Sequence, residues 1–93
     1  MNDTELKALY EDIRVEIEYF DTIDLFPLME ENMLIADLMD KIEEKYNDDF
    51  ISKTGSECLF NLMSGDELVD YLRDRYSDKI SIDTSYREYI HLK

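Results

Sequence analysis

The side chains that could carry out chemistry are few in this sequence, and their spacing favours no reaction. Cys58 is the only cysteine and His91 the only histidine, so there is neither a thiol beside a base nor a set of closely spaced zinc ligands. Acid pairs such as Asp48-Asp49 lack the glycine-centred loop of a calcium site. Carboxylates are so numerous that no pair is singled out as acid and base. The sequence therefore predicts no catalytic residue, no metal site and no enzyme.

Negative charge is the strongest chemical property of the chain. Lys and Arg total 10 against 24 Asp and Glu, a formal net charge of -14. Residues 1–50 hold 16 of these acids and only 4 of the bases, so the field comes mainly from the first half. Such a surface repels nucleic acids and anionic membranes and attracts basic protein surfaces. We therefore expect a protein partner with a basic patch, and neither nucleic acid nor membrane.

Length and composition favour one small helical domain spanning residues 1–93. The sequence has 44% hydrophobic residues, 2 Gly and 1 Pro, which is enough for a core and leaves few chain breakers. The start of the sequence is acidic rather than signal-like, and no apolar run approaches the length of a membrane span. With a single cysteine, Cys58, no intramolecular disulfide is available. We expect a cytoplasmic protein whose oligomeric state stays open.

Three helices are expected from apolar spacing. The first spans 4–20, and the second runs from Met33 to Tyr46 with Asn32 as its N-cap and an end at 47–49. Ser64 and Glu67 form a capping box that opens a third helix through Tyr76.

Two segments fit no single pattern. Residues 50–63 are open between a short helix, an extended segment and an apolar loop. In the tail, Ile80 and Ile82 alternate with polar residues like a strand, and Tyr86, Tyr89 and Ile90 have helical spacing. We expect a short extended segment followed by a final turn of helix.

The order of these elements resembles the acyl carrier protein family over residues 5–76. Leu25-Phe26-Pro27-Leu28 is similar to the apolar lead-in to that family's modification site, and Asp37-Leu38 to the acidic–Leu pair of its second helix. Ser64 to Tyr76 is similar to its last helix. Asn32 stands at the position of the serine that carries phosphopantetheine. The resemblance implies a three- or four-helix bundle, with 5–76 as its core and 77–93 as a C-terminal extension.

The resemblance also implies a role in protein docking. An amide has no hydroxyl to accept the phosphopantetheinyl group, so no cofactor is expected at Asn32. Either the serine was lost or replaced by engineering, or the likeness concerns the helical scaffold alone. In the family, the acidic second helix docks on basic patches of partner enzymes. Here that surface would comprise Glu30, Glu31, Met33, Leu34, Asp37, Asp40 and Glu44.

Two other functions are consistent with the composition. An acidic inhibitor of phage or plasmid type could mimic nucleic acid and occupy the channel of a nuclease or repair enzyme. An immunity protein could neutralise a basic nuclease toxin by the same electrostatic means. The sequence alone does not separate these from carrier-like docking, because all three need a basic protein partner.

Overall fold

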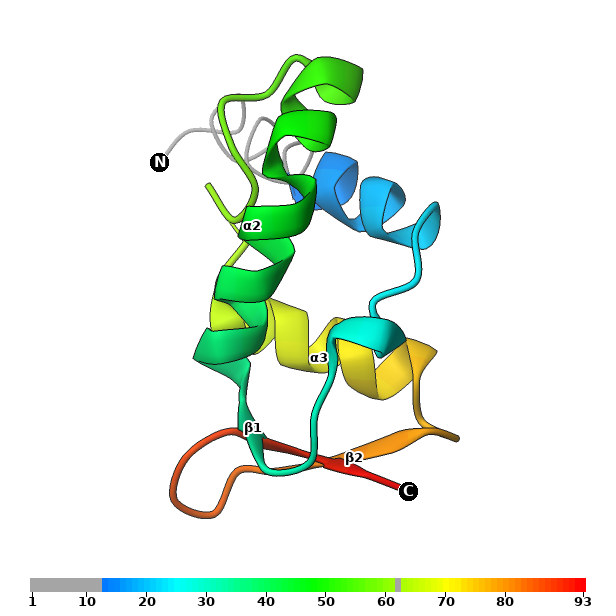
Figure 1. Ribbon diagram of the computed structural model, residues 1–93, viewed down its shortest axis with the longest axis vertical. Helices are drawn as coiled ribbons and strands as arrows, with labels where there is room; N and C mark the ends of the chain where they lie inside the picture. The colour runs from blue at the N-terminus through cyan, green and yellow to red at the C-terminus, as the bar shows by residue number, and fades with distance from the viewer. Residues whose placement is uncertain (1–12, 62) are drawn as a thin grey trace, which may run out of the picture.

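The fold combines helices with a small antiparallel sheet. The computed structural model describes residues 13–61 and 63–93 (Figure 1). The predicted helical bundle is wrong, because the C-terminal part of the chain forms strands that pair with a short strand before α2. In chain order the elements are helical residues 13–21, the 3-10 helix η1 (Phe26–Leu28), β1 (Met33–Leu34), α2 (Ile35–Thr54), α3 (Gly65–Arg75), β2 (Ile80–Asp83) and β3 (Tyr89–Leu92).

The central strand of the sheet is β3. The strand order is β1-β3-β2, and both pairings are antiparallel. Ile90 pairs with Met33 on one side and with Ile82 on the other, which places these three side chains in one row across the sheet. Ile90 and Met33 are buried, so this row belongs to the apolar face of the sheet. Residues 77–93, expected as an extension, thus carry two of the three strands.

The tail confirms one expectation and contradicts another. Ile80 and Ile82 lie in β2, as their alternation predicts. The expected final turn of helix is wrong: Tyr89 and Ile90 belong to β3, and Tyr86 is 85% exposed in the β2–β3 connection. Helical spacing is decisive only where one face is buried, and here tertiary pairing with β1 and β2 decides the conformation.

The second helix starts later and ends later than its sequence predicts. α2 continues through 47–49, where the side chains of Asn47 and Asp49 are bonded to other parts of the chain. The Asn47 side-chain oxygen accepts the Leu59 N–H at 2.8 Å, and Asp49 accepts the Tyr19 hydroxyl at 2.6 Å. The helix ends at Gly55, whose φ of 72° is left-handed and whose N–H bonds to the Ile51 carbonyl.

Asn32 is not the N-cap of α2. That position is held by Leu34, and Asn32 sits in the preceding turn with a left-handed φ of 60°. Its backbone N–H donates to the Ile90 carbonyl at 2.9 Å, which ties the turn to β3. Asn is among the few residue types that accept a left-handed conformation readily. A turn and strand pairing therefore explain the residue better than capping.

The third helix agrees with its prediction. The Ser64 N–H donates to the Glu67 carboxylate at 2.9 Å, and the reciprocal bond of the capping box is also present. Leu68, Val69 and Leu72 are buried on the inner side, and Tyr76 caps the C-terminal end. Local signals are sufficient here because both capping residues are neighbours in sequence.

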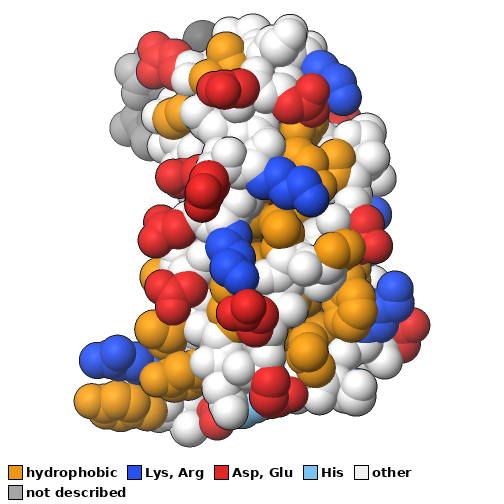
Figure 2. All heavy atoms as spheres, viewed as in Figure 1, with side chains coloured by type: hydrophobic (Ala, Val, Ile, Leu, Met, Phe, Trp, Pro, Cys, Tyr) orange, Lys and Arg blue, Asp and Glu red, His pale blue; other side chains and the backbone are white. Residues whose placement is uncertain are grey.

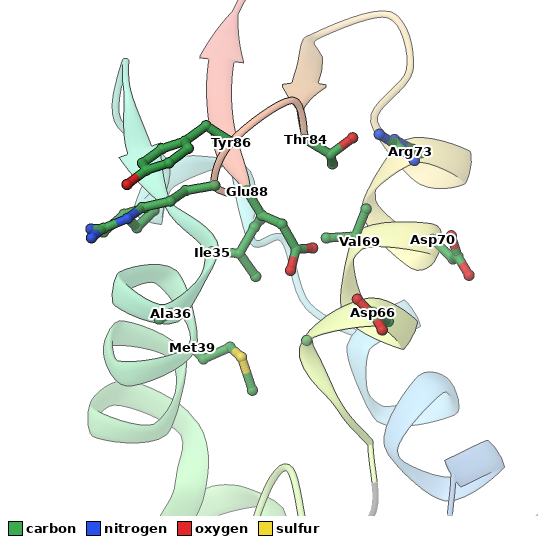
Figure 3. A pocket seen from close by; sticks show the side chains of 13 residues that line it. Ile35, Ala36, Met39, Asp66, Val69, Asp70, Arg73, Thr84, Tyr86 and Glu88 are labelled. Atoms are coloured by element: carbon green, nitrogen blue, oxygen red, sulfur yellow. The ribbon is translucent and has the colours of Figure 1, made fainter.

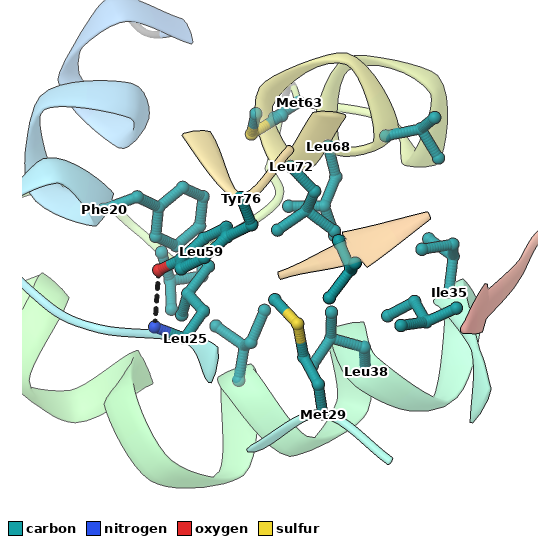
Figure 4. Close-up of a cluster of buried hydrophobic side chains, with 14 of the residues drawn as sticks. Phe20, Leu25, Met29, Ile35, Leu38, Leu59, Met63, Leu68, Leu72 and Tyr76 are labelled. Carbon is teal, nitrogen blue, oxygen red and sulfur yellow. Dashed lines mark hydrogen bonds between the residues drawn. The ribbon is translucent and has the colours of Figure 1, made fainter. Parts of the chain in front are cut away.

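One hydrophobic core joins the helices and the sheet (Figure 4). Phe20 and Leu25 come from the N-terminal part, and the Tyr76 hydroxyl accepts the Leu25 N–H at 2.8 Å inside the cluster. Completely covered side chains include Phe20, Leu25, Leu38, Ile42, Phe50, Leu68, Leu72 and Ile90.

None of the helices within residues 13–61 and 63–93 is both long enough and apolar enough to cross a bilayer.

Candidate functional site

The exposed face of α2 carries a row of carboxylates. Asp37, Asp40 and Glu44 follow one another at helical spacing, and Asp48 extends the row by one further turn. All four side chains are exposed, and none forms a hydrogen bond or an ion pair within the described residues. Acidic side chains (red) line the edge of the molecule along which α2 runs (Figure 2). Three of the residues predicted to bind a partner therefore lie together, and the described part of the chain offers them no hydrogen bond or ion pair.

The two glutamates before α2 have structural contacts instead. Lys41 Nζ lies 3.2 Å from Glu30 Oε1, which links the turn to α2. Glu31 Oε1 lies 2.8 Å from His91 Nδ1, and Glu31 Oε2 accepts the Leu92 N–H at 2.9 Å. These contacts, the His91 bond first, hold the pKa of the Glu31 carboxyl below its ordinary value. Both carboxylates hold in place the turn that precedes β1.

The two apolar residues predicted at the tip of the docking surface lie deeper than expected. Met33 is only 6% exposed and packs in the core. Leu34 is half-buried and lines a groove beside α2. The carboxylate row and this groove are adjacent, because Leu34, Ala36 and Met39 border the groove while Asp37 and Asp40 stay exposed on the same helix.

The groove has a volume of about 680 Å³ and lies between α2, α3 and the β2–β3 connection (Figure 3). Ile35, Met39 and Val69 form its apolar floor. Asp66 comes from the first turn of α3, and Glu88 from the end of the connection. Apolar floor and charged rim together are the usual composition of a binding groove.

The cations that border the groove are engaged elsewhere. Arg73 donates to the Ile82 carbonyl at 3.4 Å, and the Arg87 guanidinium lies over the Tyr86 ring at 5.8 Å from its centroid. The Glu88 carboxylate forms no hydrogen bond or ion pair within the described residues. The sequence does not predict the groove, because the spacing of Tyr86, Tyr89 and Ile90 indicates a final turn of helix. Only the pairing of β3 with β1 and β2 brings the β2–β3 connection beside α2.

Two tyrosines with strongly raised pKa values have structural explanations. Burial, assisted by the bond to Asp49, raises the pKa of Tyr19 well above its usual value. Burial likewise raises the pKa of Tyr71 to about 12, against the opposing influence of Arg75. In both residues burial favours the protonated phenol, which donates to a carboxylate: Tyr19 to Asp49 and Tyr71 to Asp21.

Other reactive groups are dispersed over the fold. Cys58 is half-buried with a free thiol, and His91 is held by Glu31. Glu16, which the sequence analysis did not single out, is 3% exposed and accepts the backbone N–H groups of Asn61 and Met63 at 3.2 Å each. It holds Asn61 and Met63 against helical residues 13–21. Within the described parts of the chain, no three His, Cys, Asp or Glu side chains are grouped so as to hold a metal ion.

The Glu31 contacts predict a specific acid sensitivity. Because the folded-state pKa of Glu31 is lowered, its stabilisation is fully present above the ordinary value of 4.5 and is lost as pH falls through the folded value. We expect Glu31→Gln to flatten the decline in unfolding free energy below about pH 4.5, measured by urea denaturation across pH. Some decline will remain, since three other carboxyls of the described residues have lowered pKa values: Asp24, Asp49 and Asp83.

The matched control for this prediction is Glu43→Gln. Glu43 is an exposed carboxylate of α2 without a partner among the described residues, so its loss changes net charge equally. Identical pH profiles for the two variants would show that the Glu31–His91 contact adds no acid sensitivity.

No family model matches the chain, and neither curated proteins nor solved structures show significant similarity to it. The resemblance to acyl carrier proteins therefore stays a prediction drawn from the sequence. Function has to be argued from the surface chemistry of the fold, in which the α2 carboxylate row and the adjacent groove stand out.

Proposed function

We propose that this chain is a protein-binding module that docks on a basic surface of its partner through the α2 carboxylate row. The observation that carries the proposal is a set of exposed carboxylates that form no hydrogen bond or ion pair with the described residues: Asp37, Asp40, Glu44 and Asp48. Like charges at helical spacing repel one another and weaken the isolated helix. A basic partner relieves this repulsion, so the arrangement of the carboxylates along α2 favours binding of a cationic surface.

Electrostatic attraction suits such a module because it acts before contact. A surface of one sign speeds diffusional encounter with a basic patch and sets the orientation of the complex. The net charge of -14 also keeps anionic nucleic acids and membrane surfaces away. From the carrier-protein resemblance we retain docking without phosphopantetheine, since Asn32 has no hydroxyl to modify. We place this activity in the cytoplasm.

The first test compares capture of partners by two charge-reversed forms of the protein. Asp37→Lys with Asp40→Lys alters the α2 row, whereas Asp74→Lys with Asp78→Lys makes the same change in net charge at exposed positions elsewhere. We expect the α2 variant to lose at least about tenfold in affinity for the captured partner, or roughly 1.4 kcal/mol, while the control stays close to wild type. Affinity is measured by titration with the purified partner.

Two outcomes would contradict the docking model. Equal losses in both variants would mean that net charge, not the α2 row, governs binding. A different pair of results would support an acidic nucleic-acid mimic that acts through another face. In that case double-stranded DNA displaces the partner from the wild-type protein, and the α2 variant still binds the partner. Salt dependence adds a further check, because contacts between exposed charges weaken as ionic strength rises.

A further inference from the structure

Glu88 lies in the groove as a charged group without a partner among residues 13–61 and 63–93. Its side chain is half-buried, and its carboxylate forms no hydrogen bond or ion pair in the described part of the chain. In Figure 3 this carboxylate lies between Ile35 and Val69, toward Met39 and Asp66. A partly desolvated carboxylate gains more from a cationic partner than a fully exposed one does, because screening by water is weaker.

The backbone around Glu88 is fixed, so its side chain starts from a defined point beside the groove rather than from a free loop. The Glu88 carbonyl accepts the Ile35 N–H at 2.9 Å, at the first residue of α2. Tyr89, the next residue, pairs with Leu34 and with Asp83 in the sheet. Preorganised charges bind more tightly because little conformational freedom is lost on binding.

The groove combines this carboxylate with an apolar floor. Ile35, Met39 and Val69 offer hydrocarbon and sulfur surface next to the two acids, Glu88 and Asp66. Methionine adapts its shape to a bound group, which suits a site that receives a side chain. Arg73 and Arg87 also line the groove, but Arg73 bonds to the Ile82 carbonyl and Arg87 lies over the Tyr86 ring. Within the described residues, neither arginine forms an ion pair with Glu88 or Asp66.

We infer that the groove receives an arginine side chain of the basic partner, whose stem packs on Ile35, Met39 and Val69 and whose guanidinium binds Glu88 and Asp66. This inference rests on the proposed docking function and names the chemistry that the partner must present there. Arginine fits better than lysine, because its planar group has five donors, is less strongly hydrated and can serve two carboxylates at once. Its aliphatic stem covers apolar surface while the charged end stays at the rim.

The test uses the full chain and two capped tripeptides. One is acetyl-Leu-Arg-Leu-amide, and the other has citrulline, a neutral group of the same shape, in place of arginine. In amide NMR titrations the arginine peptide should shift signals of groove residues such as Ala36, Met39, Val69 and Glu88. We expect Glu88→Gln to weaken that binding about tenfold, the size of a lost charge-assisted hydrogen bond. Asp74→Asn, with the same charge change outside the groove, should bind as wild type does.

Several results would overturn the inference. Equal binding of the citrulline peptide would remove the role of the guanidinium, and shifts confined to the outer face of α2 would place the contact elsewhere. Groove signals that move with protein concentration alone would show a second copy of the chain as the occupant. If Glu88→Gln binds the captured partner like wild type while the α2 reversal does not, the arginine site is wrong and the docking function stands. If neither variant loses affinity for the partner, both the arginine site and the docking function are contradicted.

Discussion

A chain that stops after Asp78 is expected not to fold. The truncation removes β2 and β3, and with them the core side chains of Ile80 and Ile90. β1 then has no strand to pair with, and the apolar row across the sheet is lost. Burial of each isoleucine is worth about 2–3 kcal/mol, and with the sheet hydrogen bonds the loss approaches the 5–15 kcal/mol that stabilises a typical domain. Thermal unfolding by circular dichroism and amide NMR dispersion measure the outcome.

A single substitution in the same part of the chain serves as the control. It distinguishes the effect of losing β2 and β3 from the effect of any change in the C-terminal residues. Tyr86 is 85% exposed in the β2–β3 connection, so Tyr86→Ser should leave stability within about 0.5 kcal/mol of wild type. A truncated chain that still unfolds cooperatively, with a dispersed spectrum, would show that a helical core stands without the sheet.

The second large effect is expected at Arg75, whose guanidinium joins α3 to the end of the first helix. It donates to the carbonyls of Phe20 and Ile23 and to the Tyr71 hydroxyl. The first of these contacts satisfies a carbonyl near the C-terminal end of helical residues 13–21, where a positive charge is also favoured. Arg75→Ala should lower the free energy of unfolding by about 3 kcal/mol, as measured by urea denaturation, because several charge-assisted bonds are lost together.

Arg73→Ala is the control on the same helix. Arg73 is exposed and has a single long bond to the Ile82 carbonyl, so its removal should cost below about 1 kcal/mol. Arg75→Lys should fall between the two, since an ammonium keeps the charge but not the planar arrangement of donors. Similar stabilities for Arg75→Ala and Arg73→Ala would refute the role assigned to this side chain.

Local signals in the sequence predict local structure well. The capping box of Ser64 and Glu67 places the start of α3, and the apolar spacing of Leu68, Val69 and Leu72 identifies its buried side. Asn32 shows the opposite case. Its type suits both an N-cap and a left-handed turn, and the choice depends on a hydrogen bond to Ile90 from far along the chain.

The residues of the candidate site likewise divide into those that local sequence predicts and those that depend on distant contacts. Asp37, Asp40 and Glu44 lie on one exposed face, as the helical period predicts for the sequence. Glu30 and Glu31 have the same side-chain type, and nothing local indicates that Lys41 and His91 engage them. The groove was not predictable at all, because Glu88 reaches α2 only through the pairing of β3 with β1.

The pairing of β1 with β3 also determines how the molecule reaches its folded state. Helices α2 and α3 are built from local contacts and form within about microseconds, whereas the sheet requires Met33 and Ile90 to meet across a long loop. We expect closure of that loop to set the folding rate, since distant pairings are slow to form. During synthesis the N-terminal elements emerge first, so the part of the core that the sheet covers stays open until β2 and β3 arrive. The interval between those two events is when this acidic chain is most exposed to aggregation, and its net charge is the protection available then.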